Sequence, residues 1–299
     1  MNVKTQNPVV KNFCLAVFAI LALVALAAIG TGKVHAETIG SGFPEGHYYR
    51  SYAPNLALEV AKTDRTFSGK GMLQVIPTEG SLDNLNKTAD GEVQIALTQP
   101  DAYMYFRSTE PNKANQIILL GNVPVEECVL MVTSENSKIK EFDDLTKDHT
   151  VNIGVPGSGS QASWAYFKKL IPGLKDVRTN ENSNVLALGD LQTEAADALI
   201  FVTTKDKTSE VLEIVNAEDS GLRFVDLENS NLNEKLPSGK PVYSAEKVNV
   251  EPGSNWPDKV MGQCMRLQII ANTNNPRKLN EAVVRSIIRA GSSVATIRE

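Results

Sequence analysis

Two segments of the sequence join a β-type run to a helix-type pattern through a turn of small residues. The first reads MLQVIPTEGSLDNLNK, Met72–Lys87, and the second reads TVNIGVPGSGSQASWAYFKKL, Thr150–Leu170. Glycine and serine at such a turn let a ligand approach the backbone, and the first amides of a helix have no partner within it. These amides and the helix dipole attract anions. The sequence therefore predicts two lobes that close on one small acidic molecule.

The N-terminal segment has the pattern of an export signal. Lys4 and Lys11 precede an apolar run over Phe13–Ile29, and small residues follow up to Ala36. We predict a signal peptide over residues 1–36, cleavage after Ala36 and a periplasmic mature protein. The alternative is an uncleaved membrane anchor, because an apolar run of 17 residues is nearly long enough to span a bilayer.

Charge and cysteine content narrow the class of protein further. Removing residues 1–36, which contain three lysines and no acidic residue, changes the net charge from −5 to −8. We expect no nucleic-acid partner, because such partners need a basic surface. The mature chain keeps Cys128 and Cys264. In an oxidising compartment these form either a disulfide or two buried thiols on neighbouring strands, and the sequence gives no distance that decides between them.

Strand-like and helix-like segments alternate along the mature chain, which predicts an α/β fold. The expected strands are 38–42, 72–77, 93–98, 116–120, 127–133, 151–155, 198–202, 222–227 and 265–271. The expected helices are 48–62, 81–89, 99–106, 160–170, 185–193, 207–215 and 278–289, with a short turn at 141–145. Residues 229–255 are rich in Asn, Ser, Gly, Pro and Lys, so we expect a loop with at most one hairpin there.

Two long apolar runs, Glu127–Thr133 and Cys264–Ala271, are candidates for strands that cross between two lobes. On this arrangement lobe 1 comprises residues 37–127 and 264–299, and lobe 2 comprises residues 128–263. The two cysteines then lie on adjacent strands, where a disulfide would brace the hinge.

Three motifs, in this order, resemble the TAXI branch of the extracytoplasmic solute-binding proteins of TRAP transporters. They are IGSGFPEGHYYRSYAPNLA at Ile39–Ala57, PTEGSLDNLNKTADGEVQIALTQPD at Pro77–Asp101 and DDLTKDHTVNIGVPGSGSQ at Asp143–Gln161. The chain departs from the family pattern after residues 198–202, where Thr203-Thr204-Lys205 stand in place of a glycine and a proline. With the crossing strands included, the resemblance covers nearly the whole mature chain.

This resemblance implies a type II-like periplasmic binding protein with two lobes and hinge strands between them. It implies capture of a small organic anion, such as glutamate, glutamine or a dicarboxylate, and delivery to the membrane permease subunits of a TRAP transporter. We expect the protein to act as a monomer and without a cofactor. A protein of the same fold could instead serve a sensor kinase or an ABC permease, and the sequence does not separate these roles.

The candidate ligand-binding residues lie at the two helix starts, at strand ends and in the first motif. They are Ser41, Gly42, Tyr48, Thr78, Gly80, Ser81, Asn84, Gln99, Gly157, Ser158, Gly159, Ser160 and Phe201. Ligands of open α/β sheets sit at the carboxyl ends of strands, and serine hydroxyls and helix amides donate to anions.

Each candidate also has a structural interpretation. The serines and Gln99 can cap helices, and the glycines can serve turn geometry alone. Tyr49 could face the ligand in place of Tyr48, and Phe201 could belong to the core.

Two enzymatic alternatives fit the sequence less well. Gly157–Ala162 matches the G-x-G-x-x-A dinucleotide pattern, but no acidic residue ends a strand about 20 residues later. A serine hydrolase needs a general base, and only His47 and His149 remain after processing, without a G-x-S-x-G motif. No Cys, His and carboxylate cluster has zinc-ligand spacing, and no EF-hand loop occurs. We therefore expect no enzymatic activity and no metal site.

Overall fold

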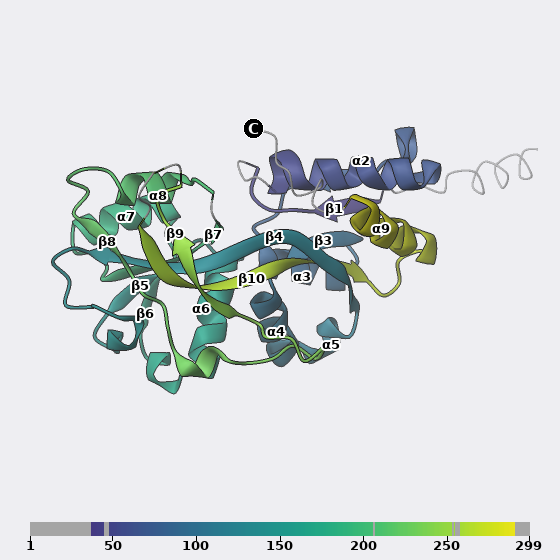
Figure 1. Cartoon of the computed structure of the whole chain (residues 1–299). Coiled ribbons are helices and arrows are strands. Elements are labelled where there is room, and N and C mark those ends of the chain that lie inside the picture. Colours follow the sequence, from purple (N-terminus) through teal and green to yellow (C-terminus); the bar gives the residue numbers. More distant parts are fainter. Residues whose placement is uncertain (1–36, 45–47, 206, 253, 255–257, 291–299) are drawn as a thin grey trace, which may run out of the picture. The chain divides into compact units, whose positions relative to one another are not determined.

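Two long strands run through the sheet at the centre of the computed structural model (Figure 1). The structure describes residues 37–44, 48–205, 207–252, 254 and 258–290, and the predicted signal peptide or anchor lies outside these ranges. The strands in this part of the chain are β1 Thr38–Gly40, β2 Gln74–Ile76, β3 Ile95–Thr98, β4 Ile117–Ser134, β5 Thr150–Asn152, β6 Arg178–Asn180, β7 Ala198–Thr204, β8 Leu222–Val225, β9 Ser244–Asn249 and β10 Lys259–Asn272.

The helices of the described residues cover this sheet. They are α2 Ala53–Thr63, α3 Ser81–Ala89, α4 Pro100–Thr109, α5 Pro111–Ala114, α6 Gly159–Leu170, α7 Asn184–Gln192, α8 Glu210–Val215 and α9 Arg277–Ala290. A π-helical turn, η1 Tyr48–Tyr52, precedes α2, and short 3-10 turns lie at Arg65–Phe67, Gly69–Gly71, Phe142–Asp144, Pro172–Leu174 and Ser230–Leu232. The prediction of an α/β fold is confirmed.

Strands β4 and β10 are antiparallel and join the two halves of the sheet. The strand order is β2-β1-β3-β10-β4-β7-β5-β6, with β8 also paired to β4 and β9 to β10. One end of β10 pairs with β3 and the other with β9, while β4 pairs with β7 and β8. We call β1–β3 with α2–α5 and α9 the first half, and β5–β9 with α6–α8 the second half. The lobe boundaries at 127/128 and 263/264 remain a prediction.

The first half has apolar side chains on both faces of the sheet. Helices α2 and α9 pack on one face, where Leu56 and Val283 meet Ile39 and Ile269. Helices α3, α4 and α5 cover the other face (Figure 1), in a cluster that includes Leu85 and Ile270. Because Ile269 and Ile270 are consecutive strand residues, they point to opposite faces and belong to different clusters.

The second half repeats this arrangement around β4 and β7. Val129 and Met131 point to the face covered by α6, in a cluster with Trp164 and Phe167. The alternate residues, Leu130 among them, point to the face that carries α7 and α8. Strands buried on both faces read as continuous apolar runs, which is why the run at 127–133 could be predicted from the sequence.

Several elements differ from the sequence expectation. The runs at 116–120 and 127–133 belong to one strand, because β4 continues through Gly121–Glu126 by pairing with β10. Strand β5 ends at residue 152 rather than 155, because Gly154 turns the chain with a φ of 77°. In the expected loop at 229–255, residues 244–249 form β9, which pairs antiparallel with the next strand, β10, as one arm of a hairpin whose other arm begins beyond this segment at Lys259.

The two cysteines of the mature chain are bonded to each other. Cys264 lies opposite Cys128 in the β4–β10 ladder, with 4.0 Å between their Cα atoms. Both are buried in the cluster beneath α7 and α8. Of the two alternatives left open by the sequence, the structure has the disulfide.

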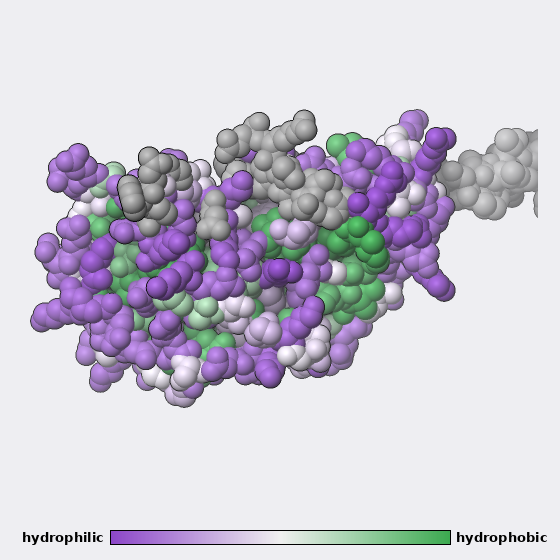
Figure 2. Space-filling view, in the orientation of Figure 1, coloured by the Kyte–Doolittle hydropathy of each residue, from purple (hydrophilic) through white to green (hydrophobic). Residues whose placement is uncertain are grey.

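The surface in Figure 2 is mostly hydrophilic, with hydrophobic areas near α9. The large hydrophobic side chains exposed in the described part of the chain include Leu119 on β4 and Ile288 on α9. None of the helices formed by the described residues has the length and hydropathy needed to cross a membrane. Most of the large apolar side chains described are instead buried in the four clusters around the sheet, as the hydrophobic effect requires.

Candidate functional site

A cavity of about 380 Å³ lies where the two halves meet. This volume falls within the usual range of small-molecule sites, about 300–1,000 Å³. Its lining comes from the ends of strands, from the starts of α3 and α6, and from β4 and β10: Ser41, Gly42, Phe43, Tyr48, Gly80, Ser81, Leu97, Gln99, Glu127, Gly154, Val155, Ser158, Gly159, Ser160, Ser183, Asn184, Val202 and Leu267. The structure thus brings nine of the thirteen predicted residues together around one space.

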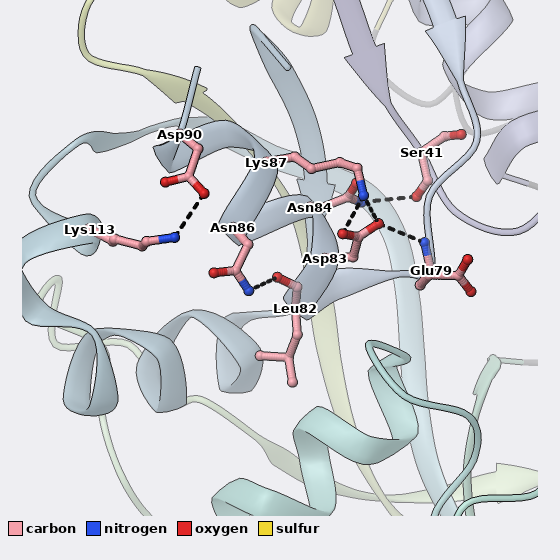
Figure 3. A network of polar contacts seen from close by, with 9 residues as sticks. All are labelled: Ser41, Glu79, Leu82, Asp83, Asn84, Asn86, Lys87, Asp90 and Lys113. Atoms are coloured by element: carbon pink, nitrogen blue, oxygen red, sulfur yellow. Dashed lines mark hydrogen bonds and ion pairs between the residues drawn. The ribbon is translucent and has the colours of Figure 1, made fainter. Parts of the chain in front are cut away.

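The first helix start is held rigidly in place. Gly80 has a φ of 117°, which a residue with a side chain rarely adopts, and Ser81 begins α3. The Ser81 hydroxyl donates to Gln99 Oε1 and accepts from the Gln99 amide, both at 3.2 Å. On the outer side of the turn, the Asp83 carboxylate accepts from the Glu79 amide and pairs with Lys87 (Figure 3).

The second helix start presents two serine hydroxyls to the cavity. Ser158 is the N-cap of α6, and its Oγ accepts from the Gln161 amide at 3.2 Å. Ser160 Oγ accepts from the Val202 amide of β7 at 3.1 Å. Each hydroxyl therefore keeps its own hydrogen for donation to a ligand.

Glycine at position 154 makes room for these hydroxyls. A Cβ on Gly154 would lie 2.9 Å from Ser158 Oγ and 3.5 Å from Ser160 Oγ. The amides of Gly159 and Ser160 occupy the first two positions of α6, where a helix offers no internal acceptor. This corner of the cavity is therefore rich in hydrogen-bond donors.

The two helix starts touch each other across the halves. The Leu82 amide of α3 donates to the Gly157 carbonyl at 3.2 Å, and a Cβ on Gly80 would lie 3.1 Å from that same oxygen. A Cβ on Gly159 would lie 2.3 Å from Gln99 Oε1. Glycine at these positions lets the backbones of the two halves approach this closely.

A buried carboxylate lies on the crossing strand β4. Glu127 is only 6% exposed and accepts a hydrogen bond of 2.7 Å from the Tyr48 hydroxyl. Burial raises the pKa of Glu127 to about 7, although hydrogen bonds from Tyr48 and Gln99 oppose the rise. Burial, and next the charge of Glu127, raise the pKa of Tyr48 well above its usual range, so its hydroxyl remains a donor. Of the two neighbouring tyrosines considered, the structure places Tyr48 in the cavity.

A second buried carboxylate joins the halves behind the cavity. Asp101 at the start of α4 accepts from the Ser163 hydroxyl of α6 at 2.5 Å and from the Tyr243 hydroxyl at 2.7 Å. Burial raises the pKa of Asp101, and these hydrogen bonds oppose the rise. The contact between α4 and α6 is thus polar as well as apolar.

Four predicted residues do not line the cavity: Thr78, Asn84, Gly157 and Phe201. Phe201 is buried in the cluster beneath α7 and α8, and the next strand residue, Val202, faces the cavity instead. Gly157 turns away from the cavity, since its missing Cβ would lie 2.9 Å from Glu79 Cβ. Thr78 is buried at the turn after β2, where its amide donates to the Gly42 carbonyl.

Asn84 supports the lining from behind. Its side-chain amide donates to the Ser41 carbonyl at 3.1 Å and to the Leu97 carbonyl at 2.7 Å; Figure 3 shows the bond to Ser41. Asn84 thereby ties α3 to the loop after β1 and to β3.

We expect Asn84→Ala to lower the free energy of unfolding by about 2–3 kcal/mol, because two buried carbonyls lose their donor. Urea unfolding followed by circular dichroism measures this loss. The matched control is Asn86→Ala on the same helix, where an exposed amide bonds only to the Leu82 carbonyl (Figure 3), with an expected change within about 0.5 kcal/mol. Equal losses in the two variants would contradict this role of Asn84.

Nine lining residues were not among the sequence candidates: Phe43, Leu97, Glu127, Gly154, Val155, Ser183, Asn184, Val202 and Leu267. Gly154 and Val155 lie inside the second strand-to-helix junction, and Phe43 adjoins Gly42. These three residues could therefore have been proposed from their closeness to a motif in the sequence. Glu127 also had a signal, since burying a carboxylate at the edge of a strand costs free energy unless the carboxylate has bonding partners. Ser183 and Asn184 at the start of α7 carry no such local signal.

The described residues contain no group of three or more His, Cys, Asp or Glu side chains placed to hold a metal ion. Among the described lining residues, Glu127 carries the charge, and the serine hydroxyls and backbone amides are hydrogen-bonding groups.

Solved structures share this architecture at low sequence identity. XAC2383 from Xanthomonas citri, bound to chloride, matches with a TM-score of 0.54 and 11% identity over 86% of this chain and 84% of that one. The same protein bound to ATP matches with a TM-score of 0.52 and 10% identity, over 86% and 83% of the two chains. The GluR0 ligand-binding core in complex with L-glutamate matches with a TM-score of 0.52 and 13% identity, over 88% and 96%. These likenesses confirm the two-lobed fold of periplasmic binding proteins.

Comparison of sequences gives the family. No curated protein sequence matches the chain. The profile of the NMT1-like family matches residues 39–245, which include both helix starts, the crossing strand β4 and nearly all of the cavity lining. The chain belongs to the NMT1-like family.

Proposed function

We propose that the protein is an extracytoplasmic solute-binding protein that encloses a small organic acid between its two lobes. The observation that carries this proposal is a cavity at the contact between two helix starts, one from each half, where the start of α6 supplies free hydrogen-bond donors. Helix N-termini and serine hydroxyls stabilise a bound carboxylate. A ligand that contacts both halves favours the closed arrangement by its greater affinity for it.

We propose binding rather than catalysis. The hydroxyls of the lining residues Ser41, Ser81, Ser158 and Ser160 are bonded to backbone amides, a backbone carbonyl or the side chain of Gln99, whereas a nucleophilic serine is paired with a general base. In this respect Ser158 and Ser160, whose hydroxyls accept from backbone amides, are suited to donate to a ligand.

The partner and the location rest on the motifs. The resemblance of residues 39–57, 77–101 and 143–161 to TAXI-type proteins supports delivery to a TRAP-type permease from the periplasm by a monomer. Service to an ABC permease or a sensor kinase uses the same cavity. The neighbouring genes distinguish these roles, because a TRAP partner requires permease subunits of that type beside this gene.

The first test is thermal unfolding of the purified protein with glutamate, glutamine, C4 to C6 dicarboxylates and 2-oxo acids. A ligand present at 100 times its dissociation constant stabilises the folded state by about 2.7 kcal/mol, which raises the Tm by several degrees. Unchanged unfolding with every acid in the set would contradict the proposed function.

We expect Ser158→Ala combined with Ser160→Ala to weaken binding about 100-fold, because hydrogen bonds to a charged group contribute about 1.5–3 kcal/mol each. Isothermal titration calorimetry measures the change, and circular dichroism checks that the variant remains folded. Ser244→Ala, at an exposed position of β9, serves as the control and should bind as wild type does. Wild-type affinity in the double variant would exclude these hydroxyls from the site.

A further inference from the structure

Among the residues that the structure describes, the cavity lining contains one charged side chain, Glu127, and no Lys, Arg or His. Glu127 projects from β4, where Thr204 of β7 and Met265 of β10 are its paired neighbours. Neither neighbour carries a charge. A carboxylate buried this deeply is costly to keep ionised unless a positive group comes close to it.

Within the part of the chain that the structure describes, Glu127 has hydrogen bonds and no countercharge. Its partners are the neutral donors Tyr48 and Gln99. A nearby cation, Lys205 just after β7, pairs with Glu126 and Glu246 instead. Because an ionised carboxylate accepts about four hydrogen bonds, Glu127 keeps acceptor capacity that faces the cavity.

The cavity therefore combines two chemically opposite kinds of group. The start of α6 offers the Ser158 and Ser160 hydroxyls and backbone amides as donors, whereas Glu127 offers an acceptor with negative charge. Apolar side chains, among them Leu97, Val202 and Leu267, lie in the same lining. Such a lining suits a short molecule with a carboxylate at one end, a protonated amine at the other and an aliphatic body.

We propose that Glu127 is the specificity-determining residue of the site, that it binds a protonated amine, and that the ligand is an amino acid rather than a dicarboxylate. This inference rests on the proposed function, since it assigns the second end of the same ligand. A second carboxylate in place of the amine would face Glu127, and like charges disfavour each other in a buried site.

This assignment fixes the sign of the pH dependence. An ammonium group selects the ionised form of Glu127, whose pKa is about 7. The other ionisable groups that act on Glu127 are Tyr48 of η1, which stays protonated, and Asp101 of α4, which Ser163 and Tyr243 hold from behind. Binding of an amino acid should therefore be strongest above pH 7 and weaken by up to tenfold per pH unit below it. Binding of an amine-free acid should change in the opposite direction.

The experiment compares amino acids with their amine-free analogues by isothermal titration calorimetry between pH 5.5 and 8.5. The probes are L-glutamate with glutarate, and the other L-amino acids with the corresponding deaminated acids. We expect wild type to bind one amino acid at least 100-fold tighter than its analogue at pH 8. Glu127→Gln should reduce that preference to less than tenfold and remove the pH dependence. The control is Glu126→Gln at the adjacent residue, which pairs with Lys205 and should leave both unchanged.

The outcomes separate the two proposals. Binding of amine-free acids as tightly as amino acids, or more tightly as the pH falls, would overturn the role of Glu127 and leave the proposed function in place. An unchanged amine preference in a folded Glu127→Gln protein would do the same. If Glu127→Gln does not fold, the pH titration of wild type decides, because it needs no variant. Failure of every acid in both sets to bind would overturn the proposed function itself.

Discussion

Reducing the Cys128–Cys264 disulfide should lower the free energy of unfolding by about 4–5 kcal/mol, and the Tm by roughly 10 °C. The bond closes a loop of 136 residues, and the chain-entropy estimate for a loop of that length is close to 5 kcal/mol. Urea unfolding of the protein with and without reductant measures the difference.

A variant separates the cross-link from other effects of the reductant. Cys128→Ala with Cys264→Ala should unfold at the same urea concentration whether or not reductant is present. The cysteines face each other on β4 and β10, the two strands that run through both halves, where we predict the hinge. Identical unfolding of oxidised and reduced wild type would show that the bond contributes nothing to stability.

Gly159→Ala should weaken ligand binding at least 100-fold, or about 2.7 kcal/mol, without lowering the Tm of the protein alone. The new methyl group would lie 2.3 Å from Gln99 Oε1 and 2.8 Å from the Cδ and Nε2 atoms of that side chain. Gln99 cannot move aside cheaply, because Ser81 and Glu127 both bond to its amide. The variant should therefore hold the two halves apart.

The backbone at Gly159 can accept alanine without strain. A loss of binding in this variant would therefore reflect the closing of the two halves rather than a local loss of stability. Gly159 does not have a positive φ, and alanine favours the helix that begins there. Calorimetry of ligand binding and thermal unfolding test the two parts separately. The control is Gly189→Ala on α7, where a Cβ would meet no atom within 4 Å. Wild-type affinity in Gly159→Ala would show that the contact with Gln99 is not needed for binding.

The elements that could be predicted from the sequence are those with local signals. Ser81 begins α3 as predicted, and α6 begins at Gly159, one residue before the predicted start. In both, a glycine-serine turn precedes an amphipathic pattern, and turn residues and caps act within a few positions of the chain. The crossing strands β4 and β10 could also be predicted in part, because a strand buried on both faces reads as a continuous apolar run in the sequence.

The features that escaped prediction depend on contacts far apart in the chain. Phe201 and Val202 are both apolar, and only the pairing of β7 decides which of them faces the cavity. Asn84 lies one turn after Ser81 on α3, but its partners are the loop after β1 and strand β3. The proximity of Glu127 to Tyr48 and Gln99 likewise depends on the assembled sheet.

The pairing of β4 with β10 also determines when this protein can fold. Residues 128 and 264 are neighbours in the sheet, and β10 supplies pairing surface to both halves. Neither half of the sheet is complete until the last strand has been synthesised, and contacts of such long sequence separation form slowly. We therefore expect a chain with this topology to complete its fold only late in its synthesis. That delay suits a protein that is threaded through a membrane before it folds, as the N-terminal segment predicts.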